Sequence, residues 1–141
     1  MVEIIVSSDK LENLNGQLKL EIIDFNGQQI WQEEKEGNIA ANNSQVIHKQ
    51  DFGSLIKQNN FNKLFLKATF TTAIASYQQL HYFEAAKDLM LEEPNIQKQF
   101  KKVADGYELQ LLSNTLVKNL QITTAAKDAR FSDNYVDLLP K

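Results

Sequence analysis

The stretch QLKLEIIDF, residues 17–25, decides the fold class. Leu18, Leu20 and Ile22 alternate with polar residues, and this period of two is typical of a half-buried antiparallel strand. After Ile22 the apolar residues fall on the other phase, which predicts a β-bulge or a strand buried on both faces at that point. The stretch therefore indicates a protein built mainly from β-sheet.

The residues that follow it predict a hairpin. NGQQ, residues 26–29, is a turn signal, because Gly27 adopts a positive φ at little cost. IWQEEKE, residues 30–36, then returns as the partner strand.

Similar alternating segments recur along the first 90 residues, and GSLIKQNN, residues 53–60, predicts a single helical turn among them. The further strand candidates are VEIIVSS at 2–8, SQVIHKQDF at 44–52, KLFLKATF at 63–70 and ASYQQLHYF at 75–83. Six or seven strands at a spacing of roughly 8 to 15 residues suit an immunoglobulin-like β-sandwich. We expect residues 1–90 to form this domain with its full complement of strands.

The composition changes near residue 90, where EAAKDLMLEEPNI reads as a linker because Pro94 cannot donate to a sheet. Beyond it, a hairpin is predicted around Asp105 and Gly106, and TLVKNLQIT at 115–123 supplies one more strand. Three strands are too few to close a two-sheet core. Residues 91–141 are therefore expected to form an incomplete immunoglobulin-like domain.

An incomplete domain has an open sheet edge, and such an edge pairs readily with another chain. We expect an uncovered apolar stripe that includes Leu116, Leu120 or Phe131. The consequence is expected to be either self-association through residues 96–141 or weaker order there than in residues 1–83. The first domain is expected to remain protected.

The tail ARFSDNYVDLLPK, residues 129–141, reads as the approach to a strand that does not follow. Phe131 is expected to plug the end of the sandwich. Asp133 or Asn134 can bond to backbone amides in the turn, and Tyr135 is expected to bury its ring as in a tyrosine corner.

Charge and composition argue against several function classes. The net charge is −3 with no concentrated basic face, so nucleic acid is not an expected partner. The apolar runs fall far short of the roughly 18 to 20 residues that span a bilayer, and no export signal is evident, so no membrane association is expected. The absence of cysteine excludes disulfides and thiolate chemistry, and it leaves the compartment unreadable.

The histidines His48 and His81 are too few and too far apart to indicate a metal site, and we interpret both as ordinary satisfied or solvent-facing side chains. No phosphate-binding glycine loop and no Ser-His-Asp arrangement is evident. We therefore expect no metal and no cofactor.

Several segments together carry a family resemblance. DFNGQQIW, NNSQVIHKQDFGSLI, KLFLKATF and LHYFEAAKDLMLEEPNI resemble, in order, the penultimate immunoglobulin-like domain of β-mannosidases of glycoside hydrolase family 2. DGYELQLLSNTLVKNLQIT and FSDNYVDLLP resemble the last domain of the same enzymes. The last motif is the most specific, although Lys141 stands where the family usually has glycine followed by a terminal strand.

The resemblance implies a non-catalytic accessory region whose parent enzyme hydrolyses terminal β-mannose residues. In that family the catalytic glutamates lie on a preceding (β/α)8 barrel, which is the implied partner, and no segment here matches a barrel. A retaining glycosidase needs two carboxylates roughly 5 Å apart. The candidate pairs in this chain are Glu33 with Glu34, Glu92 with Glu93, and Asp133 with Asp137.

None of these pairs is expected to be catalytic. Neighbours in a strand, such as Glu33 and Glu34, point to opposite faces. The other pairs suit a solvated linker and a capped turn. We expect no catalytic residues and no enzyme activity from this chain alone.

The alternative is a carbohydrate-binding module with an exposed aromatic platform formed by Trp31, Tyr77, Tyr82 or Phe61. Trp31 follows Ile30 directly in a strand, so one of the two must point inward, and we interpret Trp31 as a core residue. Asn42 begins an N-glycosylation triplet, which has meaning only in a eukaryotic secreted protein.

Overall fold

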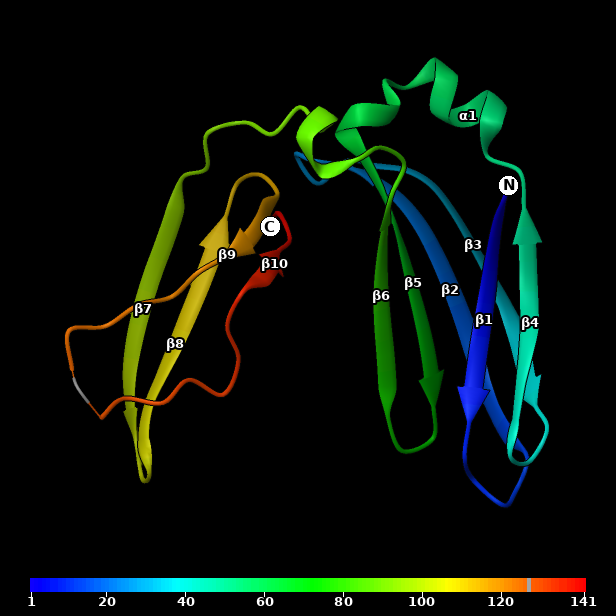
Figure 1. Ribbon diagram of the computed structural model, residues 1–141, viewed down its shortest axis with the longest axis horizontal. Helices are drawn as coiled ribbons and strands as arrows, with labels where there is room; N and C mark the ends of the chain where they lie inside the picture. The colour runs from blue at the N-terminus through cyan, green and yellow to red at the C-terminus, as the bar shows by residue number, and fades with distance from the viewer. Residues whose placement is uncertain (127) are drawn as a thin grey trace. The chain divides into compact units, whose positions relative to one another are not determined.

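The computed structural model describes residues 1–126 and 128–141, which divide into two compact units (Figure 1). The first unit comprises Met1–Asp24 and Gln29–Leu89, and the second comprises Phe25–Gln28 and Met90–Lys141. Strands dominate both units, so the predicted all-β class is confirmed.

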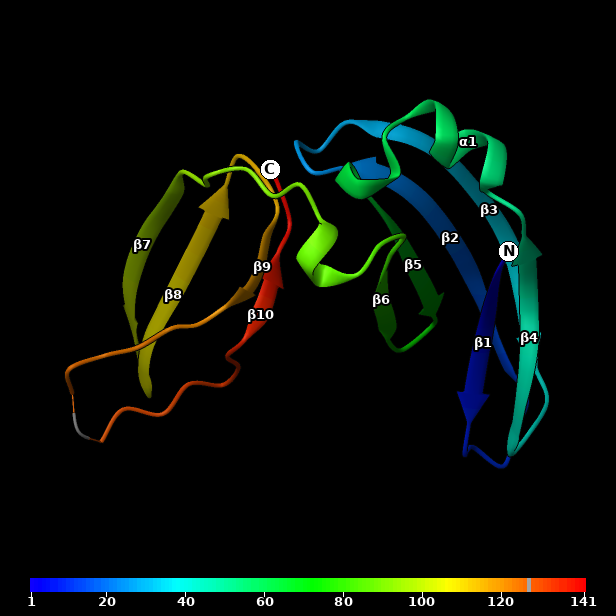
Figure 2. The ribbon, with the colours of Figure 1, turned by 45° about the horizontal axis from the view of Figure 1, so that its top comes forward.

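The first unit is a sandwich of a four-stranded and a two-stranded antiparallel sheet (Figure 2). The strand order is β3-β2-β5-β6 in the wide sheet and β1-β4 in the narrow one. Its elements are β1 (Val2–Ser8), β2 (Leu14–Asp24), β3 (Gln29–Ile39), β4 (Asn43–Gln50), α1 (Gly53–Gln58), η1 (Phe61–Lys63), β5 (Leu64–Thr72), β6 (Ser76–Tyr82) and η2 (Ala86–Asp88).

The local signals around β2 are confirmed. The pairing of β2 with β3 shifts register between Ile22 and Ile23, where the sequence predicts a bulge. The following turn contains Gly27 at φ 91°. The predicted helical turn is α1.

The core of the first unit lies on the inner face of β2. Leu18, Leu20 and Ile22 are each no more than 1% exposed, and Ile4 and Val6 of β1 pack against them. Fully burying one such side chain contributes about 1.5–3 kcal/mol. Because the side chains of β2 alternate with a period of two, the apolar residues Leu18, Leu20 and Ile22 that stabilise the first unit all lie on one face of this strand.

Phe70 packs over a pair of glycines on the same inner face. Gly16 and Gly37 lie directly opposite each other on β2 and β3. A Cβ added at Gly37 would lie 2.8 Å from Cε2 of Phe70, and one added at Gly16 would lie 2.6 Å from its Cζ. The ring, which is 5% exposed, thus fills the space that side chains would occupy.

The outer face of the wide sheet carries a buried ion cluster. Nζ of Lys67 lies 2.8 Å from Oε2 of Glu21, and Nζ of Lys19 lies 3.0 Å from its Oε1. Burial would raise the pKa of the Glu21 carboxyl, but the hydrogen bonds from Lys67 and Lys19 outweigh burial and lower this pKa below its ordinary value. The same pairing with Glu21 raises the pKa of Lys19.

The second unit consists of two short antiparallel pairs (Figure 2). β7 (Ile96–Val103) pairs with β8 (Gly106–Ser113) through the predicted turn at Gly106, and β9 (Val117–Leu120) pairs with β10 (Val136–Leu138). Within this unit the carbonyl oxygen of Phe25 accepts hydrogen bonds from the amide of Leu116 and the hydroxyl of Thr115, both at 2.8 Å.

The tail differs from the sequence expectation, because it contains the short strand β10. Val136 lies opposite Leu120 and Leu138 lies opposite Val117, so the described part of the second unit has four strands rather than three. Pro140 also forms a bridge to Ser113. A three-residue strand is too short to give a period-two signal, which is why the sequence analysis missed it.

The predicted tyrosine corner is wrong. Tyr135 is 64% exposed, and its hydroxyl accepts a hydrogen bond from Nε2 of Gln121 at 3.1 Å. The left-handed backbone of Tyr135, at φ 57°, ends the turn without turning the ring inward. Phe131 is 41% exposed and Leu116 only 1% exposed, so Leu116 is not part of an uncovered stripe.

Substituting Gly37→Ala should destabilise the first unit by about 1–3 kcal/mol, because the new methyl group collides with the Phe70 ring. In a Phe70→Leu background the same substitution should cost much less. A double-mutant cycle by urea denaturation measures this coupling, and additive effects would show that the ring does not occupy the glycine space.

Substituting Glu21→Gln should cost about 1–3 kcal/mol at pH 7, because it removes charge-assisted hydrogen bonds to both lysines. The pKa of Glu21 is lower in the folded state than in the unfolded state. Its contribution to the free energy of unfolding is therefore fully present above the unfolded pKa, and it is lost as the pH falls through the folded pKa. Urea denaturation between pH 2 and 7 should therefore show that the free energy of unfolding falls less steeply toward acid pH in the variant than in the parent chain. The exposed Glu36→Gln is the matched control and should leave the profile unchanged.

Candidate functional site

The first carboxylate pair does not converge. Glu33 lies opposite Leu20 on the inner side of β3, and its Oε1 is 3.9 Å from Nδ1 of His48. Glu34 points to the other face, where its carboxylate accepts a hydrogen bond from Nε2 of Gln17 at 3.3 Å. The two groups therefore cannot act together on one sugar ring.

The second pair, Glu92 and Glu93, is exposed in the segment between η2 and β7 that has no regular secondary structure. This segment contains Pro94 and corresponds to the predicted linker.

In the third pair, Asp133 and Asp137 accept hydrogen bonds from different parts of the chain. Oδ1 of Asp133 accepts the backbone amide of Asn134 at 2.8 Å, as expected for a turn cap. Asn134 in turn accepts the amide of Ile122 at 2.7 Å and donates to its carbonyl oxygen at 2.8 Å. The polar residues of FSDN thus fix the loop before β10.

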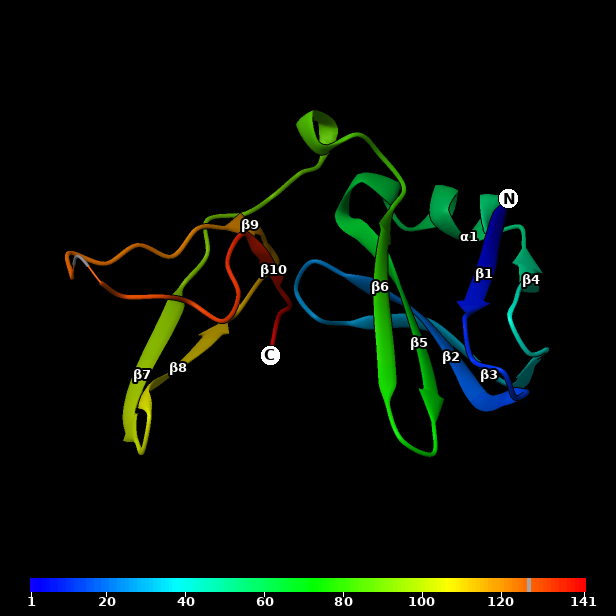
Figure 3. The same ribbon diagram turned by 60° about the horizontal axis from the view of Figure 1, so that its bottom comes forward.

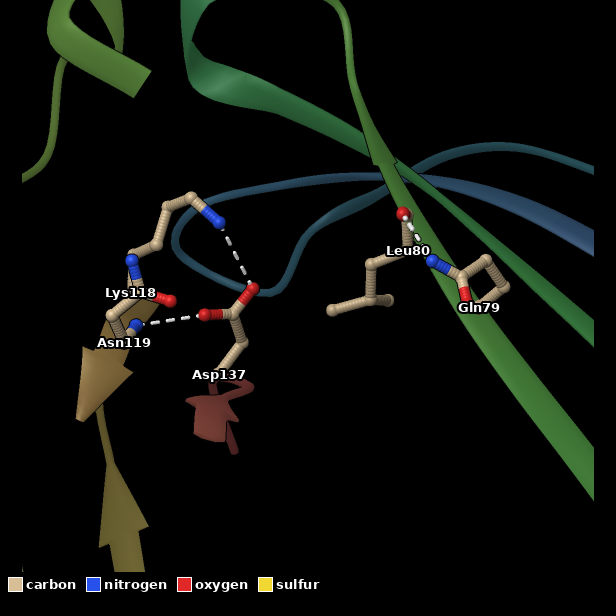
Figure 4. Close-up of polar contacts among 5 residues, drawn as sticks. All are labelled: Gln79, Leu80, Lys118, Asn119 and Asp137. Atoms are coloured by element: carbon tan, nitrogen blue, oxygen red, sulfur yellow. Dashed lines mark hydrogen bonds and ion pairs between the residues drawn. The ribbon is translucent and has the colours of Figure 1, made fainter. Parts of the chain in front are cut away.

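Asp137 joins β10 to β9 (Figure 4). Its Oδ1 accepts the backbone amide of Asn119 at 2.8 Å, and its Oδ2 lies 3.3 Å from Nζ of Lys118. Asn119 has a left-handed backbone at φ 53°, and the Asp137 carboxylate anchors it there. Asp137 therefore has a structural role in holding the short strand pair.

Glu21 is the buried carboxylate that the sequence analysis missed. It is 7% exposed although it lies on the outer face of its sheet, where the alternation of β2 predicts solvent. The signal that could have found it is the pattern of lysines, since Lys19 precedes it by two residues and Lys67 lies directly opposite on β5. Both carboxylate oxygens of Glu21 are therefore engaged by lysines within the sheet.

The histidines differ from each other. His81 is exposed and makes an edge-on ring contact with Phe83 at 5.5 Å. His48 is only 8% exposed, so it does not face solvent; its Nδ1 lies 3.9 Å from Oε1 of Glu33, and its Nε2 has no hydrogen-bond partner among the described residues. Across residues 1–126 and 128–141, no three potential ligands gather into a metal site.

The aromatic candidates divide into core and surface residues. Trp31 packs against the core cluster and meets Phe52 edge-on with ring centroids 5.0 Å apart, which confirms its interpretation as a core residue. Tyr82 is partly buried beside Phe65 at 6.3 Å. Tyr77 is 57% exposed and is the most accessible candidate in the first unit.

A concave surface of the first unit lies beside Tyr77. This surface, named the β1 groove, has a volume of about 510 Å³ and runs along β1 between Ile4 and the turn at Lys10. Leu18 of β2 and Phe70 of β5 line its floor, and Tyr77 to Gln79 of β6 line the opposite wall. Gln79 also donates from Nε2 to the carbonyl oxygen of Leu80 at 3.4 Å (Figure 4).

No helix in the described part of the chain is long and apolar enough to cross a membrane. Comparison with curated proteins gives no match. A comparison with solved structures matches a β-D-mannosidase from Dictyoglomus thermophilum, with a TM-score of 0.74 and 21% sequence identity. The match covers 99% of this chain and 17% of that chain, and at this identity it shows the fold.

Two family models match the chain in order. The mannosidase Ig/CBM-like domain matches residues 1–88, and the Ig-fold domain of mannosidases matches residues 91–141. The described residues contain no (β/α)8 barrel. The chain belongs to the mannosidase Ig/CBM-like family, and it consists of immunoglobulin-like accessory domains of a mannosidase.

Proposed function

We propose that this chain is the non-catalytic C-terminal accessory region of a β-mannosidase, and that it packs on the catalytic (β/α)8 barrel. The observation that carries the proposal is the succession of two mannosidase-type domains on one chain. The parent enzyme would hydrolyse terminal non-reducing β-D-mannose residues, consistent with the named β-D-mannosidase that has the same fold. We place the boundary of the two domains between residues 90 and 91.

The arrangement of the carboxylates supports a non-catalytic role. Glu33 and Glu34 point to opposite faces, and Glu21 and Asp137 are engaged by lysines. Glycoside hydrolysis requires one protonated and one ionised carboxyl group flanking a single bond. Glu33 and Glu34, which face opposite sides of β3, do not offer this geometry.

Carbohydrate binding is the second candidate function, and the position of Tyr77 favours it. Tyr77 is 57% exposed beside the β1 groove, where Gln78 and Gln79 offer amide groups. Its ring could stack on a sugar as aromatic platforms do. The floor of the groove is apolar, however, which suits an apolar side chain better than a hydroxylated ring.

The purified chain should neither hydrolyse an aryl β-mannoside nor bind manno-oligosaccharides. Trp31 fluorescence should be blue-shifted and unaffected by added mannan, because the indole packs against Phe52 in the core. Trp31→Ala should therefore destabilise the chain by about 3–5 kcal/mol.

Two controls separate the candidate functions. Turnover that disappears in a Glu33→Gln or Asp137→Asn variant would refute the accessory role. Saturable binding of manno-oligosaccharides that Tyr77→Ala abolishes, while Tyr82→Phe retains it, would favour the carbohydrate-binding candidate.

We also propose that the second unit self-associates, through a face that differs from the stripe predicted from the sequence. Phe100 lies opposite Leu109 and Tyr107 lies opposite Lys102, so both aromatic rings project from one face of the β7–β8 hairpin. They are 71% and 73% exposed. Exposed aromatic groups of this kind favour association.

Sedimentation velocity across a dilution series should show a reversible dimer. Added salt should strengthen this dimer, because it screens the repulsion between the Lys102 side chains of the two copies. A Phe100→Ser, Tyr107→Ser double variant should remain monomeric. Phe61→Ser, which changes an exposed aromatic residue of the first unit, is the control and should dimerise as the parent chain does. A parent chain that is monomeric at every concentration would contradict the proposal.

A further inference from the structure

The two sheets of the first unit differ in width, and the difference leaves one side of β1 without a neighbour. The wide sheet has four strands, whereas the narrow sheet has only β1 and β4. Figure 3 shows β4 beside β1, and β4 is the only strand of the described residues that is hydrogen-bonded to it. In a strand with one neighbour, backbone N–H and C=O groups of alternate residues point away from the sheet.

The β1 groove lies along this open edge. Ile4 to Ser8 of β1 form one wall, and Ala68 and Phe70 of the facing sheet form part of the floor. Neighbouring strands in a sheet lie about 4.8 Å apart, and each rises about 3.3 Å per residue. Two packed sheets lie about 10 Å apart. A five-residue strand that fills half of this gap occupies about 400 Å³ on the same figures, and the groove measures about 510 Å³.

The chemistry of the groove matches a peptide strand better than other ligands. The open edge offers backbone donors and acceptors at strand spacing, which another backbone satisfies in register. The inner residues Ile4 and Val6 already pack on the core, so inward side chains of an added strand would meet the same apolar surface. The segment VEIIVSS has no lysine or proline, the residues that commonly protect an edge.

We propose that β1 is the acceptor for an extended peptide segment of alternating apolar and polar residues, which adds to the narrow sheet as a third strand. Its inward side chains cover Ala68 and Phe70, and its backbone pairs with β1. The β-D-mannosidase that shares this fold devotes 17% of its chain to the matched region, so in that protein much further polypeptide accompanies the fold. On this proposal the narrow sheet accepts one strand more than the first domain was expected to need.

A donor strand fused to the chain tests the proposal. The sequence TVTVTV followed by the turn Asn-Gly replaces Met1, so that the donor can fold back on β1 as a two-residue hairpin. In this register its valines lie opposite Val2, Ile4 and Val6 and point inward. The matched control is VTVTVT with the same turn, which has the same composition but points its threonines inward.

The TVTVTV donor should raise the midpoint of thermal unfolding by about 5 °C. It should also slow amide exchange in β1 by about tenfold relative to the unextended chain. The VTVTVT donor should do neither. Equal effects of the two donors, or no effect of either in chains whose circular dichroism shows a folded sheet, would overturn the proposal.

Two competing occupants are distinguished on the unextended chain. If protection of β1 amides rises with protein concentration, a second copy pairs with this edge, and the proposed donor segment is wrong. If manno-oligosaccharides protect Ile4 to Val6 in a saturable manner, the groove is a sugar site instead. Exchange that is insensitive to both, together with stabilisation by the TVTVTV donor alone, supports the peptide acceptor.

Discussion

The structure of the first unit depends on the burial of one face of β2. This strand has hydrogen-bonded neighbours on both sides, β3 and β5, and its inner side chains Leu18, Leu20 and Ile22 are almost completely excluded from water. A shift of one residue in its register would exchange these side chains for Lys19 and Glu21. The apolar alternation of β2 therefore fixes the register of both neighbouring strands.

Because β2 is central, its outer face is also constrained. Glu21 lies between Gln32 on β3 and Lys67 on β5, so neighbouring side chains shield it from water. An isolated buried carboxylate would be costly, and the two lysines make it tolerable.

Sequence patterns predicted the features that are local. The bulge at Ile22, the turns at Gly27 and Gly106 and the helical turn after Phe52 follow from alternation and backbone preference, and all are confirmed. Features that depend on strand pairing were not predictable. The three residues of β10, the shielding of Glu21 and the cover of Phe70 over two glycines arise only when distant strands lie side by side.

The alternation of inward and outward side chains along a strand also separates the adjacent glutamates of β3. A catalytic carboxylate pair must converge from separate elements on one cavity, whereas here the adjacent glutamates of β3 diverge and Asp137 is used to hold β9. The β1 groove has an apolar floor formed by Leu18, Ala68 and Phe70. This apolar floor and the exposed backbone edge of β1 suit the peptide strand that we propose for the groove.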